Sequence, residues 1–589
     1  MQNKRSKDKS RLRFILLYLV VPVFLSLLVL TIVMQLWNAN LFIPFQYKWD
    51  SLFYSMIVKG IVDNGWYWYN SFIGAPDGLY IFSFPAPVVD VLNFLIIKVI
   101  SFFTNSWAAI LNFYYVLTYP LTAVTSLYVL KRFDFSYIPA LVGSMLFTFL
   151  PFHFYRGEAH LTTSAYYLIP LMVMVLLWIT SGKFDFKGKF KDAFLNKKYL
   201  FAVVLTVLVA AVNIHYAFFS CYLLLIAGFI NLFNSERRFW RRMVVPLSLI
   251  FVIILVVSAN LLPTWIYEYQ YGENPIAYDR NPIEAEIYAL RVPELILPLV
   301  NHRISFFAGF RGIYFTGGES PAVSLGIFGS IGFLFLLFIL FLKKKILQKG
   351  IDKKADSLVD VSSLNVFALF VAMTGFLGSI FAHFISSSIR CYNRMSIFIA
   401  FFSIFAFVFI LNVIKEKKFR TKLKALLVYC IYLFVLVLGI FDQTIPAFVP
   451  SYEKTEAIFF EDETFIKKIE EEVPAGSMIF QLPYHQFPEG GHVAGMLDYD
   501  HFRAYLHSEN LKWSYGGMKG EPNDFWQREI AKKPINEFLE EIKSKGFSGV
   551  YVDTNAYLDK GKSIISKIED LVKSKPILSE NGRFVFFKL

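Results

Sequence analysis

The sequence is poor in cysteine, and the placement of its three cysteines argues against two classes of small stabilised domain. Cys221, Cys391 and Cys430 all lie in or at the edge of hydrophobic runs. They form no spaced pair that would bind zinc or frame a disulfide-linked domain. The chain also shows no internal repeat, which argues against a secondary transporter, because such proteins typically carry repeated halves with broken helices at matching positions.

The composition is also not that of a soluble protein. Hydrophobic residues make up 56% and aromatic residues 18% of the 589 residues. A soluble domain does not need so much apolar surface, whereas a polytopic membrane protein does. The formal net charge is +13, but the basic residues lie in short blocks between apolar runs. That distribution is typical of cytoplasmic loops, so we expect a membrane lipid environment and no nucleic-acid partner.

The hydrophobic runs predict an α-helical polytopic membrane protein with about eleven transmembrane helices. The basic segment Met1–Arg13 precedes the first run and predicts a cytoplasmic N-terminus. An odd number of spans then places the C-terminus outside the cell. The predicted spans are about Phe14–Leu36, Ile110–Leu130, Ile138–Phe154, Thr163–Ser181, Leu200–Asn213, Tyr216–Phe233, Val244–Trp265, Ala322–Leu342, Leu364–Ile385, Tyr392–Ile414 and Ala425–Phe441.

The apolar stretch Val88–Phe103 is not counted as a span, because of where the basic loops fall. Four basic loops should be cytoplasmic: Lys183–Lys198, Arg237–Arg242, Lys343–Lys354 and Lys415–Lys424. One more span before Lys183 would place the first of these outside. We therefore expect Val88–Phe103 to enter the membrane without crossing it, within a large outer loop over residues 37–107. Within that loop, Ser51–Val62 has apolar residues at helical spacing and predicts an interfacial helix.

The composition changes near residue 442. Residues 1–441 form the predicted transmembrane domain, which includes a second outer loop over residues 266–320. Residues 442–589 predict a small extracytoplasmic α/β domain, in which helical patterns alternate with short strands. The predicted helices are Asp462–Glu472 and Pro534–Lys545, and the predicted strands are Met478–Leu482, Gly549–Val552 and Phe584–Phe587.

Ionisable residues near the membrane gather on the predicted outer side, where their cost suggests a functional site. A solvated carboxylate or a hydrogen-bonded interfacial histidine is the plain alternative for each. Glu158 and His160 are metal-ligand types, with capping or hydrogen bonding as the alternative. Arg390 and Arg394 run against the positive-inside bias, and at i, i+4 on a helical start they would clamp a phosphate together. The candidates are Asp50, Arg156, Glu158, His160, Asn213, His215, Tyr216, Arg291, Glu294, His302, Arg303, His383, Arg390 and Arg394.

This layout resembles the GT-C superfamily of membrane glycosyltransferases, which use polyprenyl-phosphate sugars. Asp50 lies in a large outer loop beside a predicted interfacial helix, and a soluble outer domain ends the chain. The stretches Lys48–Ser51, Asn281–Glu286, Glu294–Pro298, Arg390–Arg394 and Trp513–Gly516 resemble bacterial members that decorate cell-wall polysaccharides such as teichoic acids. One departure is that Glu158-Ala-His160 replaces the Asp-x-Asp or Asp-x-Glu pair of metal-dependent members, which leaves metal dependence open.

The resemblance implies an integral cell-membrane glycosyltransferase that moves a sugar from an undecaprenyl-phosphate carrier to a cell-surface glycan on the outer face. Asp50 would be the catalytic base, and Arg390, Arg394 and His383 would bind the donor phosphate. Arg156, Glu158 and His160 would bind a metal or the acceptor, with Mg²⁺ or Mn²⁺ as the metal. His215, Arg291, His302 and Arg303 are further outer-face candidates. A flippase or transporter, or a polymerase of lipid-linked polysaccharide intermediates, is the alternative.

Overall fold

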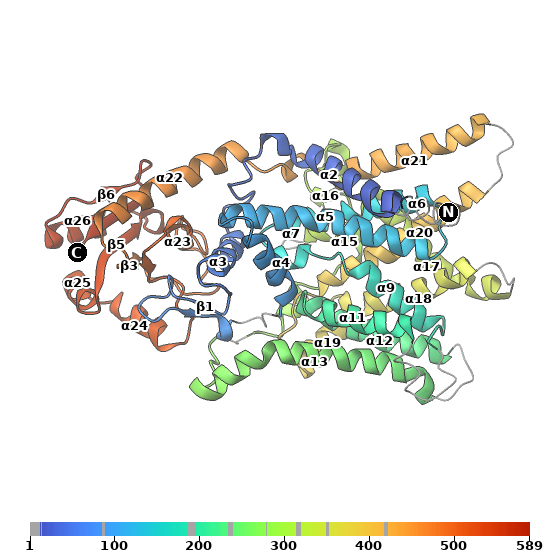
Figure 1. Cartoon of the computed structure of the whole chain (residues 1–589), viewed down its shortest axis with the longest axis horizontal. Helices are drawn as coiled ribbons and strands as arrows, with labels where there is room; N and C mark the ends of the chain where they lie inside the picture. The colour runs from blue at the N-terminus through green and yellow to red at the C-terminus, as the bar shows by residue number, and fades with distance from the viewer. Residues whose placement is uncertain are drawn as a thin grey trace, which may run out of the picture.

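The computed structural model describes residues 12, 15–84, 89–184, 196–233, 239–277, 280–313, 320–348, 353–416 and 422–589. Figure 1 shows a bundle of helices beside an α/β region formed by the C-terminal residues. The four predicted basic loops fall partly outside the described residues. The helical polytopic fold with a small C-terminal sheet is therefore as predicted.

Seven described segments are long and apolar enough to cross a membrane. They are Leu16–Met34, Trp107–Arg132, Tyr137–Arg156, Ile214–Phe233, Trp240–Tyr271, Tyr392–Ile414 and Leu423–Gln443. Shorter or more polar helices stand at the four other predicted positions. The helices of the bundle are α2 (Val21–Met34), α5 (Trp107–Arg132), α6 (Tyr137–Thr148), α7 (Pro151–Arg156), α9 (Ile169–Thr180), α11 (Lys197–Ala210), α12 (Ile214–Phe233), α13 (Phe239–Tyr271), α17 (Gly326–Gln348), α18 (Lys353–Ala372), α20 (Ser396–Glu416) and α21 (Lys422–Gln443).

The predicted span Leu364–Ile385 is wrong as a single helix. Helix α18 ends at Ala372, and a separate short helix, α19 (Leu377–Phe384), follows it. Gly375 lies between them with a φ of +69°, a left-handed conformation that ends a helix and that glycine adopts without strain. The apolar composition runs through this break, so hydropathy alone does not detect it.

The two helices of the first outer loop agree with the sequence prediction. Helix α4 (Val91–Ser101) has 11 residues and so spans about 16 Å, roughly half the hydrocarbon thickness of a bilayer. It is too short to cross, as the placement of basic loops predicted. Helix α3 (Asp50–Asp63) covers the predicted helix Ser51–Val62, and most of its residues are buried. Because α3 contacts both α5 and a C-terminal helix, α23 (Phe502–His507), it is held from two sides.

The C-terminal region contains a five-stranded mixed sheet with strand order β4-β3-β5-β7-β6. The central strand β5 pairs in parallel with β3 and antiparallel with β7. All three predicted strands are present, because each is a short apolar run that is buried in the sheet. The elements are α22 (Tyr452–Glu472), β3 (Met478–Leu482), β4 (Lys512–Trp513), α24 (Pro522–Ile530), α25 (Ile535–Ser544), β5 (Phe547–Asp553), α26 (Lys562–Val572), β6 (Ile577–Leu578) and β7 (Phe584–Lys588).

A buried charged network fastens the C-terminal region to the first outer loop. The Arg503 guanidinium donates to Asp462 Oδ2 at 3.0 Å and to the Tyr47 carbonyl at 2.9 Å. The Tyr47 hydroxyl donates to the same Asp462 oxygen at 3.0 Å, and all three residues are buried. A buried arginine is tolerated only when its charge is paired and its donors are satisfied, as they are here. This network fixes the backbone three residues before Asp50.

Candidate active site

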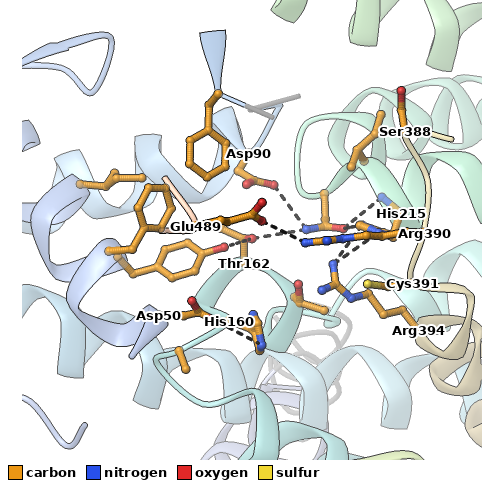
Figure 2. Close-up of a pocket in the computed structure, with 18 of the residues that line it drawn as sticks. Asp50, Asp90, His160, Thr162, His215, Ser388, Arg390, Cys391, Arg394 and Glu489 are labelled. Carbon is orange, nitrogen blue, oxygen red and sulfur yellow. Dashed lines mark hydrogen bonds and ion pairs between the residues drawn. The ribbon is translucent and has the colours of Figure 1, made fainter. Parts of the chain in front are cut away.

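A cavity of about 170 Å³, which we call the central cavity, brings polar residues from seven chain segments together. Figure 2 shows Asp50, His160 and Glu489 on one side and His215, Arg390 and Arg394 on the other, with several of them joined by hydrogen bonds or ion pairs. The membrane bundle and the C-terminal region both contribute to its wall. Its charged and polar lining includes Asp50, Tyr54, Asp90, His160, Thr162, Asn213, His215, Arg280, Arg390, Arg394 and Glu489.

Asp50 is the first residue of α3 and presents its carboxylate to this cavity. Its side chain is 48% exposed, and Oδ2 lies 3.7 Å from Nε2 of His160. That distance is too long for a direct hydrogen bond but suits an ion pair when the imidazole is protonated. The preceding turn is fixed by Ser51, whose hydroxyl accepts from Lys48 N at 3.0 Å. The N-terminal end of a helix stabilises a carboxylate, so Asp50 is held as a solvent-accessible anion.

Asp90, directly before α4, is a second carboxyl group in the central cavity. The Asn213 amide donates to its Oδ1 at 3.5 Å. Burial raises the pKa of Asp90 to about 7, although hydrogen bonding from Thr162 and the positive charge of Arg394 oppose this. The carboxyl is therefore able to exchange a proton near neutral pH. Asp90 was not among the predicted site residues, although an acid within an apolar run is itself a signal of function.

Arg394 lies against His215, which was also a predicted candidate. Its Nη1 is 3.2 Å from Nδ1 and 3.4 Å from Nε2 of the imidazole. The backbone N–H of His215 donates to Asn213 Oδ1 at 3.1 Å, which orients the start of α12. Thr162 links the Asn213 amide at 3.3 Å to the Tyr54 hydroxyl at 3.2 Å. These hydrogen bonds join Tyr54, Thr162, Asn213 and His215 into one network in the wall of the central cavity.

Arg390 is held by two carboxylates from distant parts of the chain. Its Nη1 donates to Glu284 at 2.6 Å, and its Nη2 donates to Glu489 at 3.1 Å. Arg280 also donates to Glu489, at 2.8 and 3.0 Å. Glu489 belongs to the C-terminal region, so that region closes part of the central cavity. Neither Glu489 nor Arg280 was predicted, because nothing in the sequence places residue 489 beside residue 390.

The predicted geometry of the arginine pair is wrong, although both arginines line the cavity. Arg390 lies in an irregular segment, and Arg394 lies in a short 3₁₀ helix, η5 (Tyr392–Met395). Helix α20 begins only at Ser396. The two side chains therefore do not occupy i, i+4 positions of one α-helix, and their common cavity results from the fold of the segment before α20.

Of the predicted site residues, the central cavity brings together Asp50, His160, Asn213, His215, Arg390 and Arg394. The others do not line it. His383 Nδ1 lies 2.9 Å from the Ser379 carbonyl on α19. Arg291 lies 3.9 Å from Glu294, His302 lies 3.4 Å from Asp442, and Arg303 donates to the Thr444 carbonyl at 3.2 Å. Arg156 is buried, and Glu158 lines a different cavity.

Glu158 and His160, which the sequence analysis grouped as metal-ligand types, line different cavities. In the part of the chain that the structure describes, no three side chains of histidine, cysteine, aspartate or glutamate form a group that would hold a metal ion. Asp50 and His160 are the nearest pair of metal-ligand types in the central cavity, with their atoms 3.7 Å apart. One carboxylate and one imidazole would need oxygens from a bound substrate to complete a Mg²⁺ site.

Comparisons with known proteins identify the fold. Residues 92–274, less than half of the chain, match the family described as "Domain of unknown function (DUF6311)". The crystal structure of ArnT from Cupriavidus metallidurans bound to undecaprenyl phosphate is similar, with 9% identity and a TM-score of 0.52, over 97% of each chain. The archaeal oligosaccharyltransferase AglB from Archaeoglobus fulgidus, in complex with an inhibitory peptide and a dolichol-phosphate, shows 13% identity and a TM-score of 0.45, over 97% of this chain and 74% of that chain. No curated protein sequence matches the chain.

The likeness to ArnT extends over 97% of each chain, so the two proteins share a fold that includes both the helical bundle and the C-terminal region. At 9% identity this likeness concerns the fold. The chemistry of the site has to be argued from the residues of this chain.

Proposed function

We propose that this protein is an integral membrane glycosyltransferase that transfers a sugar from a polyprenyl-phosphate carrier to a hydroxyl group of a glycan. One observation carries the proposal: a solvent-accessible carboxylate, Asp50, and the guanidinium of Arg394 line the same cavity. Transfer from a phosphate-linked donor needs both a base and a positive charge. The fold shared with ArnT, whose structure holds undecaprenyl phosphate, supports the same class of carrier.

In the proposed reaction, an acceptor oxygen attacks the anomeric carbon of the donor sugar. The bond between that carbon and the phosphate oxygen breaks, and the polyprenyl phosphate leaves with the electron pair. Asp50 accepts the proton of the acceptor hydroxyl, and His160, 3.7 Å away, positions the carboxylate. Arg394 stabilises the negative charge that develops on the departing phosphate. Asp90, with a pKa of about 7, lies in the same cavity as a second group for proton exchange.

Arg394 is a better candidate for the phosphate than Arg390. The charge of Arg390 is already balanced by Glu284 and Glu489, at 2.6 and 3.1 Å. A phosphate would have to displace one of these carboxylates before Arg390 could contribute a full positive charge. Arg394 lies against the His215 ring, with Nη1 3.2 Å from Nδ1, and its charge also acts on Asp90. We therefore place the donor phosphate at Arg394, with Arg390 and Arg280 in a supporting role.

The finer parts of the proposal come from the resemblance and the distribution of charge. The carrier would be undecaprenyl phosphate, and the acceptor would be a cell-surface glycan such as a wall polysaccharide. The reaction would take place on the outer face of the cell membrane, with the N-terminus cytoplasmic and residues 442–589 outside. Neither His383 nor Glu158 belongs to the proposed donor site, because neither lines the central cavity. A divalent cation would be held by Asp50 and His160 together with donor oxygens.

The direct test uses the purified full-length protein in nanodiscs with a radiolabelled synthetic polyprenyl-phosphate hexose. We expect release of polyprenyl phosphate and labelled glycan only when a cell-surface glycan acceptor is added. An Arg303→Ala variant is a matched control, because Arg303 contacts the Thr444 carbonyl outside the central cavity. Movement of intact donor across a vesicle membrane without bond cleavage would instead indicate a flippase. Elongation of a carrier-linked glycan would indicate a polymerase.

The proposed orientation has its own test. Single cysteines at Asn105 and at Lys183 are introduced in a background in which Cys221, Cys391 and Cys430 are replaced by serine. An impermeant maleimide added to intact cells should label the Asn105 position, which is exposed beyond α4. It should label the Lys183 position only after permeabilisation. The reverse pattern would contradict the assignment of the first loop to the outer face.

A further inference from the structure

A second cavity, of about 350 Å³, lies beside the same short loop that contributes to the central cavity. Gly157 and Glu158 line this second cavity, which we call the Glu158 cavity, whereas Ala159 and His160 line the central cavity. Its walls include the aromatic rings of Phe154, Tyr155 and Phe448. Its volume falls at the lower end of the range of about 300 to 1,000 Å³ that is typical of small-molecule sites.

Glu158 is a buried polar group with an unmet hydrogen-bonding requirement. Its side chain is fully buried, and Oε2 accepts from the Gln46 backbone N–H at 2.8 Å. Oε1 has no hydrogen-bond partner among the residues that the structure describes. The backbone N–H of the neighbouring Phe45 donates a hydrogen bond to Asn112 Oδ1 at 3.2 Å. A buried carboxyl oxygen without a hydrogen-bond partner costs folding free energy. A ligand that hydrogen-bonds to Oε1 would remove this cost.

The lining of the Glu158 cavity does not favour anionic ligands. No lysine, arginine or histidine is among its described lining residues, so nothing there would bind a phosphate. Burial raises the pKa of Glu158 to about 8, which keeps the carboxyl protonated and uncharged near neutral pH. A protonated carboxyl both donates and accepts hydrogen bonds. Two amide side chains, Gln46 and Asn301, also line the cavity.

We propose that the Glu158 cavity binds an uncharged sugar ring, with Glu158 hydrogen-bonded to a ring hydroxyl. A sugar presents hydroxyl groups at its edge and C–H groups on its faces, which matches a cavity of amide, carboxyl and aromatic groups. Phe448 is the aromatic wall best placed to receive a C–H face. It stacks on Phe154 at 4.6 Å between ring centroids and meets Tyr155 edge-on at 5.1 Å. A purely apolar lipid tail would offer no hydrogen-bond partner to Glu158 Oε1.

The loop that separates the two cavities is held rigidly. Gly157 has a φ of +46°, and a Cβ there would lie 3.0 Å from Gln46 Nε2. Gln46 also accepts from the Ala159 backbone N–H at 3.2 Å through its side-chain oxygen. The Gln46 backbone therefore binds the Glu158 carboxyl, and the Gln46 side chain binds the backbone of Ala159. These contacts fix the position of the loop that forms one wall of the Glu158 cavity.

The test measures sugar binding without any donor, so its outcome is independent of the proposed transferase function. Methyl glucoside, methyl galactoside and methyl N-acetylglucosaminide are added to the detergent-purified full-length protein, and saturation-transfer difference NMR reports their ring protons. For at least one sugar we expect a Kd that rises at least about tenfold in Phe448→Ala and in Glu158→Leu. Glu158→Gln should bind within about twofold of the wild type, because an amide also donates and accepts.

Raising the pH adds a readout that a purely structural role would not move. Wild-type binding should weaken as the pH rises through about 8, where the Glu158 carboxyl ionises, whereas binding by Glu158→Gln should not change. Binding should persist in Asp50→Asn, which alters only the central cavity. Absence of ring-proton signals for all three sugars would overturn the proposal. So would wild-type affinity in Phe448→Ala, or binding that is lost in Asp50→Asn.

Discussion

The two cavities differ in charge although one loop contributes adjacent residues to both. The central cavity contains Arg280, Arg390 and Arg394, whereas the described lining of the Glu158 cavity contains no basic side chain. Asp50 is half-exposed beside an imidazole, whereas Glu158 is fully buried. Two carboxyl groups close to one loop are thus set up for different tasks by their surroundings alone. The central cavity suits a phosphate donor, and the Glu158 cavity suits an uncharged ligand.

Among the arginines of the central cavity, the largest effect should come from replacing Arg394. Arg394→Ala should lower kcat/KM for the donor by about 10² to 10³-fold, the usual cost of losing one group that stabilises a developing charge. Arg390→Ala should cost only about tenfold, because Glu284 and Glu489 already balance that arginine. Arg394→Lys should recover part of the loss, since an ammonium lacks the guanidinium fork. Equal losses in the two alanine variants would contradict this ranking.

A smaller change should come from the acid that the C-terminal region inserts into the central cavity. Glu489 pairs with both Arg280 and Arg390, so it competes with a donor phosphate for their charge. Glu489→Gln should lower the donor KM by about three- to tenfold, which steady-state kinetics at fixed acceptor would detect. Glu463→Gln is the control, because its partner Lys467 lies on the exposed face of α22. A raised donor KM in Glu489→Gln would show that the acid supports the site.

The pH dependence of stability should reveal the two carboxyl groups whose pKa values are raised in the folded protein. Asp90 and Glu158 have folded-state pKa values of about 7 and 8, above their ordinary values near 4. The folded state therefore binds more protons than the unfolded state between about pH 4 and these values, and stability falls as the pH rises through that window. At pH 8.5, Asp90→Asn and Glu158→Gln should each melt about 2 to 5 °C higher than wild type. At pH 4.5 the gain should vanish, and a gain independent of pH would contradict the assignment.

The smallest effects are expected at predicted residues that line neither cavity. His383→Ala and Arg291→Ala should change kcat/KM by less than about twofold, because each side chain has only local contacts. Donor titrations under the same conditions as for Arg394→Ala would check this. A large loss in either variant would mean that the substrate reaches beyond the central cavity.

The sequence predicted those parts of the molecule that depend on local pattern. Helix α3 and strand β3 follow from apolar periodicity, and the short helix α4 follows from the placement of basic loops. Asp50 was predicted because an acid beside a membrane span is unusual. The break at Gly375 was missed, because apolar composition continues on both sides of it.

The sequence did not predict features that depend on tertiary contacts. Glu489 reaches the central cavity only because the network around Arg503 fixes the C-terminal region against the first loop. Glu158 and His160 were expected to act together, yet neighbouring residues of one loop line different cavities. Side chains in a loop follow no periodic pattern, so the sequence does not indicate the direction in which they point. Such residues become visible only with the fold.

The central claim is that sugar transfer takes place in the central cavity with Asp50 as the base. Donor binding and transfer are measured on the same preparation of Asp50→Asn, which keeps the shape and hydrogen bonding of the side chain but removes its basicity. We predict near-normal binding of the polyprenyl-phosphate sugar and a loss of transfer of about 10² to 10⁴-fold, which added Mg²⁺ or Mn²⁺ does not restore. Near-normal transfer by Asp50→Asn would contradict the mechanism.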